Sequence, residues 1–274
     1  MSNRQKPQIL LTNDDGIRSP GLWAAAEALE PLGFVTVAAP RDQSSGAGRS
    51  MPIGSDGRIR EEQVEVRGKT WKVYAVGGSP AQAVLHGILE LMPGKPDLVV
   101  AGINYGENLG TGVTISGTVG AALEGGAAGV PSLAVSLETD ETYHLSYSKD
   151  IDFSAAAHFT QYFARRLLAG GGWPDVDVLK VDVPSQATAQ SPWRLTRLSR
   201  LRYFVPVKPE RERLEDAARV GYTVDVDDAS LEPDSDSYGL RVDRLVTVTP
   251  LSLDLTSRVD LAELDRQLRG LSAE

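Results

Sequence analysis

The 274-residue sequence contains no cysteine and only three histidines. The absence of cysteine excludes disulfide bridges, thiolate zinc sites and iron–sulfur clusters, and so few scattered histidines disfavour a histidine-rich metal site. No run of 18 apolar residues occurs, and the segment before the first apolar run, residues 1–8, is short and polar. The sequence therefore predicts neither a membrane-spanning helix nor a signal peptide. We therefore expect a cytoplasmic protein that has no membrane partner.

Basic residues are scarce relative to acidic ones. Lysine and arginine number 28 against 37 aspartates and glutamates, which gives a net charge of -9. This balance argues against a surface that binds a nucleic acid polymer. A nucleotide-sized ligand is still compatible, because one phosphate can be held by a metal ion, backbone N–H groups and a helix N-terminus.

The segment 9–16 organises the rest of the chain. It begins with an apolar run at 9–11, which is typical of a strand buried on both faces of a parallel sheet. Asn13, Asp14 and Asp15 follow at the carboxyl end of this strand, where open α/β sheets bind their ligands. Two adjacent buried carboxylates repel each other and call for a divalent cation, a shared proton or a cationic partner. A solvated turn has the same composition, and the local sequence leaves that alternative open.

Strand-like and helical patterns alternate along the first 185 residues. The apolar strand-like runs lie at 9–11, 34–39, 97–101, 130–137 and 176–183, a hairpin pattern at 58–76, and helical patterns start near 20, 80, 116 and 150. This alternation predicts an α/β fold with a doubly wound, mostly parallel, Rossmann-like sheet. In the longest helix, predicted over 150–168, Asp150 and Asp152 are expected in the first turn.

Polar residues also follow two further predicted strands. Ser44, Ser45 and Gly46 come after the second strand, and Asn104 comes after the third. Ser116 begins a predicted helix whose free N–H groups suit a phosphate, although its small residues would equally permit close packing. Oxygen ligands that include two carboxylates favour Mg²⁺, Mn²⁺ or Ca²⁺ over zinc. The combination indicates metal-assisted phosphate chemistry.

The pattern changes beyond residue 185. We interpret 1–185 as an α/β catalytic core and 186–274 as a β-rich and helical C-terminal extension, with short β-like runs and no clear helix between 193 and 237. This stretch contains an acidic cluster that lacks calcium-loop spacing, and we interpret it as a solvated face. The cluster comprises Asp225, Asp227, Asp228, Glu232, Asp234 and Asp236.

A leucine stripe marks the C-terminal end. After a last strand at 245–249, the stripe on a predicted terminal helix consists of Leu261, Leu264, Leu268 and Leu271. Such a stripe must be covered, either by the protein's own sheet or, as we favour, by a second subunit. The extension is thus expected to serve oligomerisation.

These motifs, taken in order, resemble the SurE, or stationary-phase survival, family of metal-dependent 5′-nucleotidases. The match begins with Leu-Leu-Thr-Asn-Asp-Asp-Gly at 10–16 and Ser-Pro-Gly at 19–21. It continues through 40–46, 78–81, 102–110 and 116–122, and ends at 248–256. The departures from the family pattern are Gln82, Ala83, Ala101 and Ile115, and they bear on substrate preference more than on the metal ligands.

The resemblance implies a site and an assembly. It implies one divalent metal ion per subunit, held by Asp14, Asp15, Ser45 and Asn104, with Asp14 and Asp15 as the catalytic residues. It places Asn13, Asn108, Ser116, Gly117 and Thr118 near the substrate phosphate. It further implies a homodimer or tetramer in which C-terminal segments are exchanged between subunits.

The expected reaction is the removal of phosphate from nucleoside 5′-monophosphates, with 3′-nucleotides and short polyphosphate as further candidate substrates. The metal would polarise the phosphoryl group, while a water molecule or a carboxylate of the aspartate pair attacks phosphorus. The main alternative is a regulatory protein of the same fold that binds metal and nucleotide without turnover. An oligomeric scaffold is the third alternative, and it would leave the polar strand ends without a shared purpose.

Overall fold

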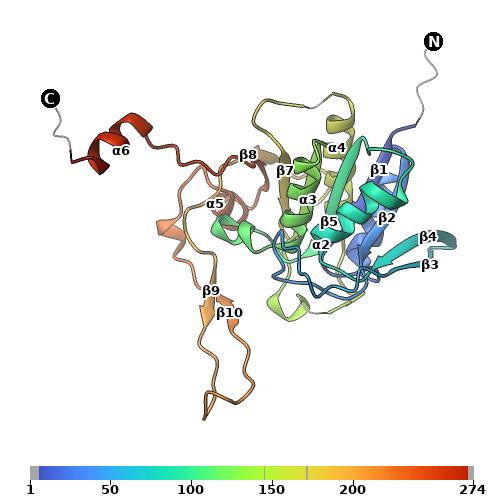
Figure 1. Ribbon diagram of the computed structural model, residues 1–274, viewed down its shortest axis with the longest axis horizontal. Helices are drawn as coiled ribbons and strands as arrows, with labels where there is room; N and C mark the ends of the chain where they lie inside the picture. The colour runs from blue at the N-terminus through green and yellow to red at the C-terminus, as the bar shows by residue number, and fades with distance from the viewer. Residues whose placement is uncertain (1–5, 145, 171, 271–274) are drawn as a thin grey trace.

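The computed structural model describes residues 6–144, 146–170 and 172–270. A nine-stranded sheet forms its centre, in the order β3-β4-β2-β1-β5-β6-β7-β11-β8 (Figure 1). The strands in this order are β3 (Ile59–Val66), β4 (Lys69–Val76), β2 (Phe34–Pro40), β1 (Gln8–Thr12), β5 (Leu98–Tyr105), β6 (Ser132–Leu137), β7 (Val178–Val183), β11 (Val246–Leu251) and β8 (Trp193–Leu195).

The sheet is mostly parallel. The six strands from β4 to β7 run in one direction. At one edge β3 is antiparallel to β4, as the hairpin pattern predicts, and at the other edge β11 is antiparallel to β7 and carries β8. The prediction of a doubly wound α/β sheet is confirmed.

Helices cover both faces of this sheet. One face packs against α1 (Pro20–Leu29) and α4 (Ser154–Leu168), and the other against α2 (Pro80–His86) and α3 (Gly117–Ala127). The central strand β1 shows why its sequence is continuously apolar. Ile9 and Leu11 belong to the first core, whereas Leu10 belongs to the second. Alternate side chains of a strand point to opposite faces, so a strand covered on both sides needs an apolar residue at every position.

Two boundaries differ from the sequence predictions. Helix α4 begins at Ser154, so Asp150 and Asp152 precede the helix and do not lie in its first turn. The reason is that Asp152 acts as a capping group, since its Oδ1 accepts a hydrogen bond from the Ser154 N–H at 2.8 Å. Strand β5 is predicted to end at Ala101 but continues to Tyr105, after a shift of register against β6. Asn104 therefore lies within the strand, paired with Ser136, and not in the loop that follows.

The C-terminal extension is more ordered than its sequence suggests. Strands β8 and β11 join the main sheet, while β9 (Phe204–Val207) and β10 (Gly221–Val224) form a separate antiparallel hairpin that projects from the body (Figure 1). No α-helix lies within the described residues 193–235, as expected, and α5 (Asp236–Arg241) begins at the very end of the stretch with Ser235 as its N-cap. Asp236 is fully buried, so the interpretation of the acidic cluster as a solvated face fails for this residue.

The terminal helix α6 (Leu261–Leu268) lies away from the sheet at the end of an extended segment (Figure 1). Leu261 and Leu268 are 61% and 79% exposed. Leu271 lies outside the described residues. The division at residue 185 and the exchange of C-terminal segments stay predictions. None of the helices in the described part of the chain has the length and apolar character to span a bilayer.

Candidate metal and phosphate site

The candidate site lies at the carboxyl ends of β1 and β5. The strand order reverses direction here, because the chain places β2 on one side of β1 and β5 on the other. Doubly wound sheets form their ligand crevice at such a switch point. Asp14 and Asp15 leave β1 here and are only 4% and 1% exposed. A solvated turn is therefore excluded.

Asn13 shapes the turn that carries the two aspartates. Its side-chain amide donates to the Gly16 carbonyl at 3.1 Å, and its Oδ1 accepts from the Gly16 N–H at 3.2 Å. Gly16 has a φ of 97°, a conformation that glycine adopts without strain. The side chain of Asn13 is thus engaged with the backbone of its own turn.

Asp14 faces the N-terminus of α3. The Thr118 hydroxyl donates to Asp14 Oδ1 and lies 3.4 Å from Asn104 Oδ1. Gly117 packs so closely that a Cβ added to it would stand 2.7 Å from the Asp14 Cβ. Backbone N–H groups at Gly117 and Thr118 also stabilise the Asp14 carboxylate. The start of α3 therefore holds Asp14 beside Asn104.

Asp15 is held by the loop after β2 and by β5. Its Oδ2 accepts a hydrogen bond from the Tyr105 N–H at 3.3 Å. The amide Nε2 of Gln43 lies 3.4 Å from Asp15 Oδ1, 3.1 Å from the Ser45 hydroxyl and 2.8 Å from the His144 carbonyl oxygen. Gln43 thereby joins Asp15 to Ser45.

The electrostatics of the pair favour a cation. Burial raises the pKa of the Asp14 carboxyl, and it raises that of Asp15 well above its ordinary value, with the charge of Asp14 adding to the effect. In the described chain, the groups that lower these pKa values are hydrogen-bond donors and not basic side chains. A bound divalent ion would supply the missing positive charge.

The available donors fit a hard metal ion. No three His, Cys, Asp or Glu side chains gather in the described part of the chain, so a metal here would need neutral oxygens in addition to the aspartates. Two neutral oxygens lie close to the aspartates. The Ser45 hydroxyl is linked to Asp15 by Gln43, which contacts both, and the amide oxygen of Asn104 is linked to Asp14 by the Thr118 hydroxyl in the same way. Two carboxylates with such oxygens suit Mg²⁺, Mn²⁺ or Ca²⁺.

The residues predicted near the phosphate divide into two groups. Gly117 and Thr118 contact Asp14, and the Ser116 hydroxyl caps α3 by accepting from the Val119 N–H at 3.1 Å. Asn108 lies elsewhere on the same edge of the sheet. Its side chain donates to the Ser136 hydroxyl at 2.8 Å, and among the described residues no hydrogen bond joins it to either aspartate.

The comparisons with known proteins identify the family of this chain. The family described as "Survival protein SurE" matches residues 9–204. The 5′-nucleotidase SurE of Thermococcus gammatolerans is 43% identical over 97% of this chain and 98% of its own length. The chain belongs to the SurE family.

Other SurE proteins match over the same extent. The 5′-nucleotidase SurE of Archaeoglobus fulgidus is 40% identical over 97% of this chain and 99% of its own length. The crystal structure of the SurE protein from Aquifex aeolicus superposes with a TM-score of 0.74 at 30% identity, covering 96% of this chain and all of that one. The fold of the SurE family therefore extends over nearly the whole chain.

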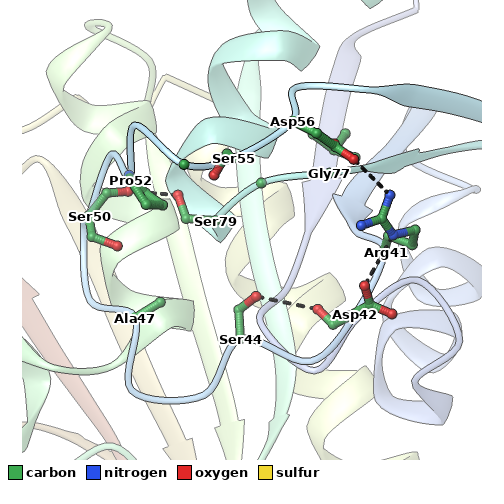
Figure 2. A pocket seen from close by; sticks show the side chains of 13 residues that line it. Arg41, Asp42, Ser44, Ala47, Ser50, Pro52, Ser55, Asp56, Gly77 and Ser79 are labelled. Atoms are coloured by element: carbon green, nitrogen blue, oxygen red, sulfur yellow. Dashed lines mark hydrogen bonds and ion pairs between the residues drawn. The ribbon is translucent and has the colours of Figure 1, made fainter.

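A cavity of about 380 Å³ adjoins the aspartate pair in this SurE chain. Figure 2 shows it between the loop 41–56 and the start of α2, with the Arg41 side chain bridging Asp42 at 3.1 Å and Asp56 at 3.4 Å. The aspartate pair is not part of its lining. Ser44 connects the two, because it lines the cavity and its N–H donates to the Asp14 carbonyl at 2.7 Å.

The departures from the SurE pattern lie near this cavity or in the core. Gln82 completes a capping box with Ser79 and accepts from the Ser55 hydroxyl at 2.7 Å, so it fixes one wall of the cavity. Ala83 and Ala101 are fully buried, and Ile115 is 60% exposed just before α3. Their effect on substrate preference stays a prediction.

Sequence reasoning missed three groups that hold Asp15. Gln43 and the Tyr105 N–H bind Asp15, and the Tyr147 hydroxyl donates to the Asp15 carbonyl at 2.9 Å. A backbone donor leaves no trace in the residue type. Tyr147 is 132 residues from its partner, so no local spacing could reveal the contact.

Proposed function

We propose that this SurE protein is a metal-dependent phosphohydrolase that removes the phosphate of nucleoside 5′-monophosphates. The observation that carries the proposal is the pair of adjacent buried carboxylates at the switch point of the sheet, faced by the N-terminus of α3. The names of its relatives, 5′-nucleotidase SurE, support the same activity.

The proposed metal ligands are Asp14, Asp15, Ser45 and Asn104, which would hold one ion per subunit. A bound ion would supply charge neutralisation and polarisation at the phosphoryl group. The residues of the chain do the rest. Thr118 and the start of α3 orient Asp14, and Gln43 orients Asp15, so the acceptor oxygens are fixed before substrate binds.

The substrate would lie across the site and the adjoining cavity. We place its phosphate near Asn108, Ser116, Gly117 and Thr118, where the α3 N-terminus provides a positive dipole end. The cavity between the loop 41–56 and α2 is large enough for a nucleoside, and its lining combines polar side chains with apolar surface, which suits a sugar and base. Recognition that centres on phosphate also allows 3′-nucleotides and short polyphosphate.

Water is the proposed nucleophile. Both oxygens of Asp15 and one of Asp14 accept hydrogen bonds, which leaves these carboxylates as ligands and orienting groups. Acid quenching during turnover with labelled substrate should therefore trap no phosphoryl-protein. Label retained on Asp14 or Asp15 would establish a covalent route instead.

The decisive test is the release of inorganic phosphate from nucleoside 5′- and 3′-monophosphates and short polyphosphate. Each would be assayed with Mg²⁺, Mn²⁺, Ca²⁺ or EDTA, on wild type, Asp14→Asn and Asp15→Asn, with Asp234→Asn as an exposed control. We expect metal-dependent release that both site variants lose while remaining folded. Nucleotide binding without release would instead identify a regulatory protein.

We also propose that the protein is a homodimer or a dimer of dimers. The support is the leucine stripe of α6, whose Leu261 and Leu268 are exposed in the single chain. Two C-terminal segments that exchange between subunits would cover these side chains.

A further inference from the structure

A buried charged cluster lies behind the loop that carries Asn108. Lys180 on β7 forms ion pairs with Asp182, also on β7, and with Asp236 of α5 at 3.0 Å. All three side chains are fully buried. No step of the proposed reaction uses them, so their presence in the interior needs another reason.

The two carboxylates of this cluster hold the backbone of the loop. Asp182 Oδ1 accepts a hydrogen bond from the Asn108 N–H at 2.7 Å. Asp236 Oδ2 accepts one from the Gly110 N–H at 3.1 Å, and its Oδ1 accepts one from the Ser199 N–H at 2.9 Å. The cluster therefore ties the loop after β5 to β7 and to the C-terminal extension.

The loop needs such a support. Gly106 and Gly110, on either side of Asn108, have positive φ values of 90° and 51°, and glycines restrict the backbone less than other residues do. Buried ion pairs contribute little net stability compared with apolar replacements, whereas they can fix one geometry among several. A placement error of about 1 Å at a site can lower a rate about 100-fold.

We propose that Lys180, Asp182 and Asp236 are positioning residues, which set the place of the Asn108 side chain in the active site through its backbone. The inference rests on the proposed function, since it assigns to Asn108 a contact with the substrate phosphate. Asp182 fixes Asn108 and Asp236 fixes the far end of the loop by accepting their hydrogen bonds, and Lys180 compensates the charge of these buried carboxylates. The C-terminal extension thereby takes part in forming the site.

The first experiment separates the hydrogen bond from the charge. Asp182→Asn keeps an acceptor oxygen for the Asn108 N–H and makes the cluster neutral, so kcat/KM should stay within about threefold of wild type. Asp182→Leu has a similar volume and no acceptor, and it should lower kcat/KM at least about tenfold while Mn²⁺ affinity is unchanged. Asp182→Ser, which is too short to reach the N–H, serves if the leucine variant does not fold. The exposed Asp234→Leu is the matched control.

The second experiment is a double-mutant cycle with Asn108→Ala. If Asp182 acts through the Asn108 side chain, Asp182→Leu should cost less than about threefold in the Asn108→Ala background. A full additive loss would overturn the proposal, as would equal losses in Asp182→Asn and Asp182→Leu. These outcomes require that wild type releases phosphate. A wild type without activity contradicts the proposed function and not the positioning role alone.

Discussion

Glu107, next to Asn108, is a buried carboxyl whose charge depends on pH near neutrality. It is 5% exposed, and its Oε2 has no hydrogen-bond partner among the described residues. Burial raises the pKa of Glu107 to about 7, and the nearby carboxylates of Glu138 and Asp182 act in the same direction. The folded state thus keeps a proton that the unfolded chain, with its ordinary pKa of 4.5, has already lost. The contribution of Glu107 to the free energy of unfolding is therefore at its maximum below pH 4.5 and decreases as the pH rises toward 7.

The variant Glu107→Gln should remove this pH dependence, because glutamine resembles the protonated acid. Between pH 5 and pH 8, the free energy of unfolding of Glu107→Gln should rise relative to that of wild type by roughly 2 to 3 kcal/mol. This figure follows from the difference between the pKa of Glu107 in the folded state, about 7, and its ordinary value of 4.5. Urea unfolding at several pH values measures the change in free energy. The exposed Glu212→Gln is the control. Parallel stability curves for wild type and Glu107→Gln would contradict the pKa shift.

Gln43 is the residue that connects Asp15 with Ser45, and its removal should loosen metal binding. Gln43→Leu keeps the approximate volume and loses the amide that contacts both proposed ligands, Asp15 and Ser45. Removing such an outer group typically weakens metal affinity about 10- to 100-fold. Calorimetric titration with Mn²⁺ would measure the change, with Gln63→Leu on the exposed side of β3 as control. Unchanged Mn²⁺ affinity would show that Gln43 only stabilises the loop after β2, through its hydrogen bond to the His144 carbonyl oxygen, and does not support metal binding.

The sequence predicted individual residues well where a site is built from one short segment. Asp14 and Asp15 are adjacent and follow a recognisable buried strand, so their burial at the edge of the sheet could be expected. Asp236 shows the limit of such reasoning. It stands in an acidic stretch that is otherwise exposed, and only the fold brings it to Lys180, 56 positions earlier in the chain.

The start of α3 is the element that most closely supports the site. Gly117 contacts the side chain of Asp14, and an added Cβ would meet Asp14 Oδ2 at 2.8 Å. Gly117→Ala should therefore displace the carboxylate and lower kcat/KM about tenfold or more, even though alanine favours a helix by up to about 1 kcal/mol.

Steady-state kinetics and thermal unfolding together would test this expectation. Gly112→Ala is the matched control, because an added Cβ there meets no atom within 4 Å. A Gly117→Ala protein that unfolds at the same or higher temperature but has lost activity would show that the effect is local. Full activity would mean that Asp14 tolerates the displacement.

Secondary structure was predictable where apolar periodicity and caps agree. Helices begin near 20, 80 and 116 as expected, and Ser79 and Ser116 accept capping hydrogen bonds, whereas Ser19 before Pro20 makes none. Prediction failed where a side chain competes with the backbone or where an element is short. Asp152 caps α4 from outside the helix, and α5 has only six residues, too few for a periodic pattern to emerge.

At the scale of the whole molecule, the sheet order explains why the proposed metal ligands, which come from distant segments, lie close together. Asp14 and Asp15 follow β1, Asn104 is the penultimate residue of β5, and the two strands are parallel neighbours, although 90 residues separate Asp15 from Tyr105. The alternation of strands and helices predicts a doubly wound sheet. It does not give the order of the strands, which depends on non-local packing.

The terminal helix α6 leads to a prediction about assembly. Leu261 and Leu268 of its leucine stripe are exposed in the single chain, and none of the residues from Leu261 to Leu268 is buried. We expect wild type to show the mass of a dimer or tetramer in light scattering after size-exclusion chromatography. Leu261→Glu with Leu268→Glu should shift the protein to a smaller assembly, because a charge on each end of the stripe opposes its burial.

A control for this assembly test is Leu255→Glu, which changes an 88% exposed leucine in the extended segment before α6. Its mass should equal that of wild type. If the double variant also keeps the mass of wild type, α6 does not carry the assembly, and a wild-type monomer would contradict exchange altogether. Because Asp236 of the same extension holds the loop of Asn108, phosphate release should be measured on each separated species. Activity confined to the larger species would show that assembly completes the site, whereas equal activity would confine α6 to association.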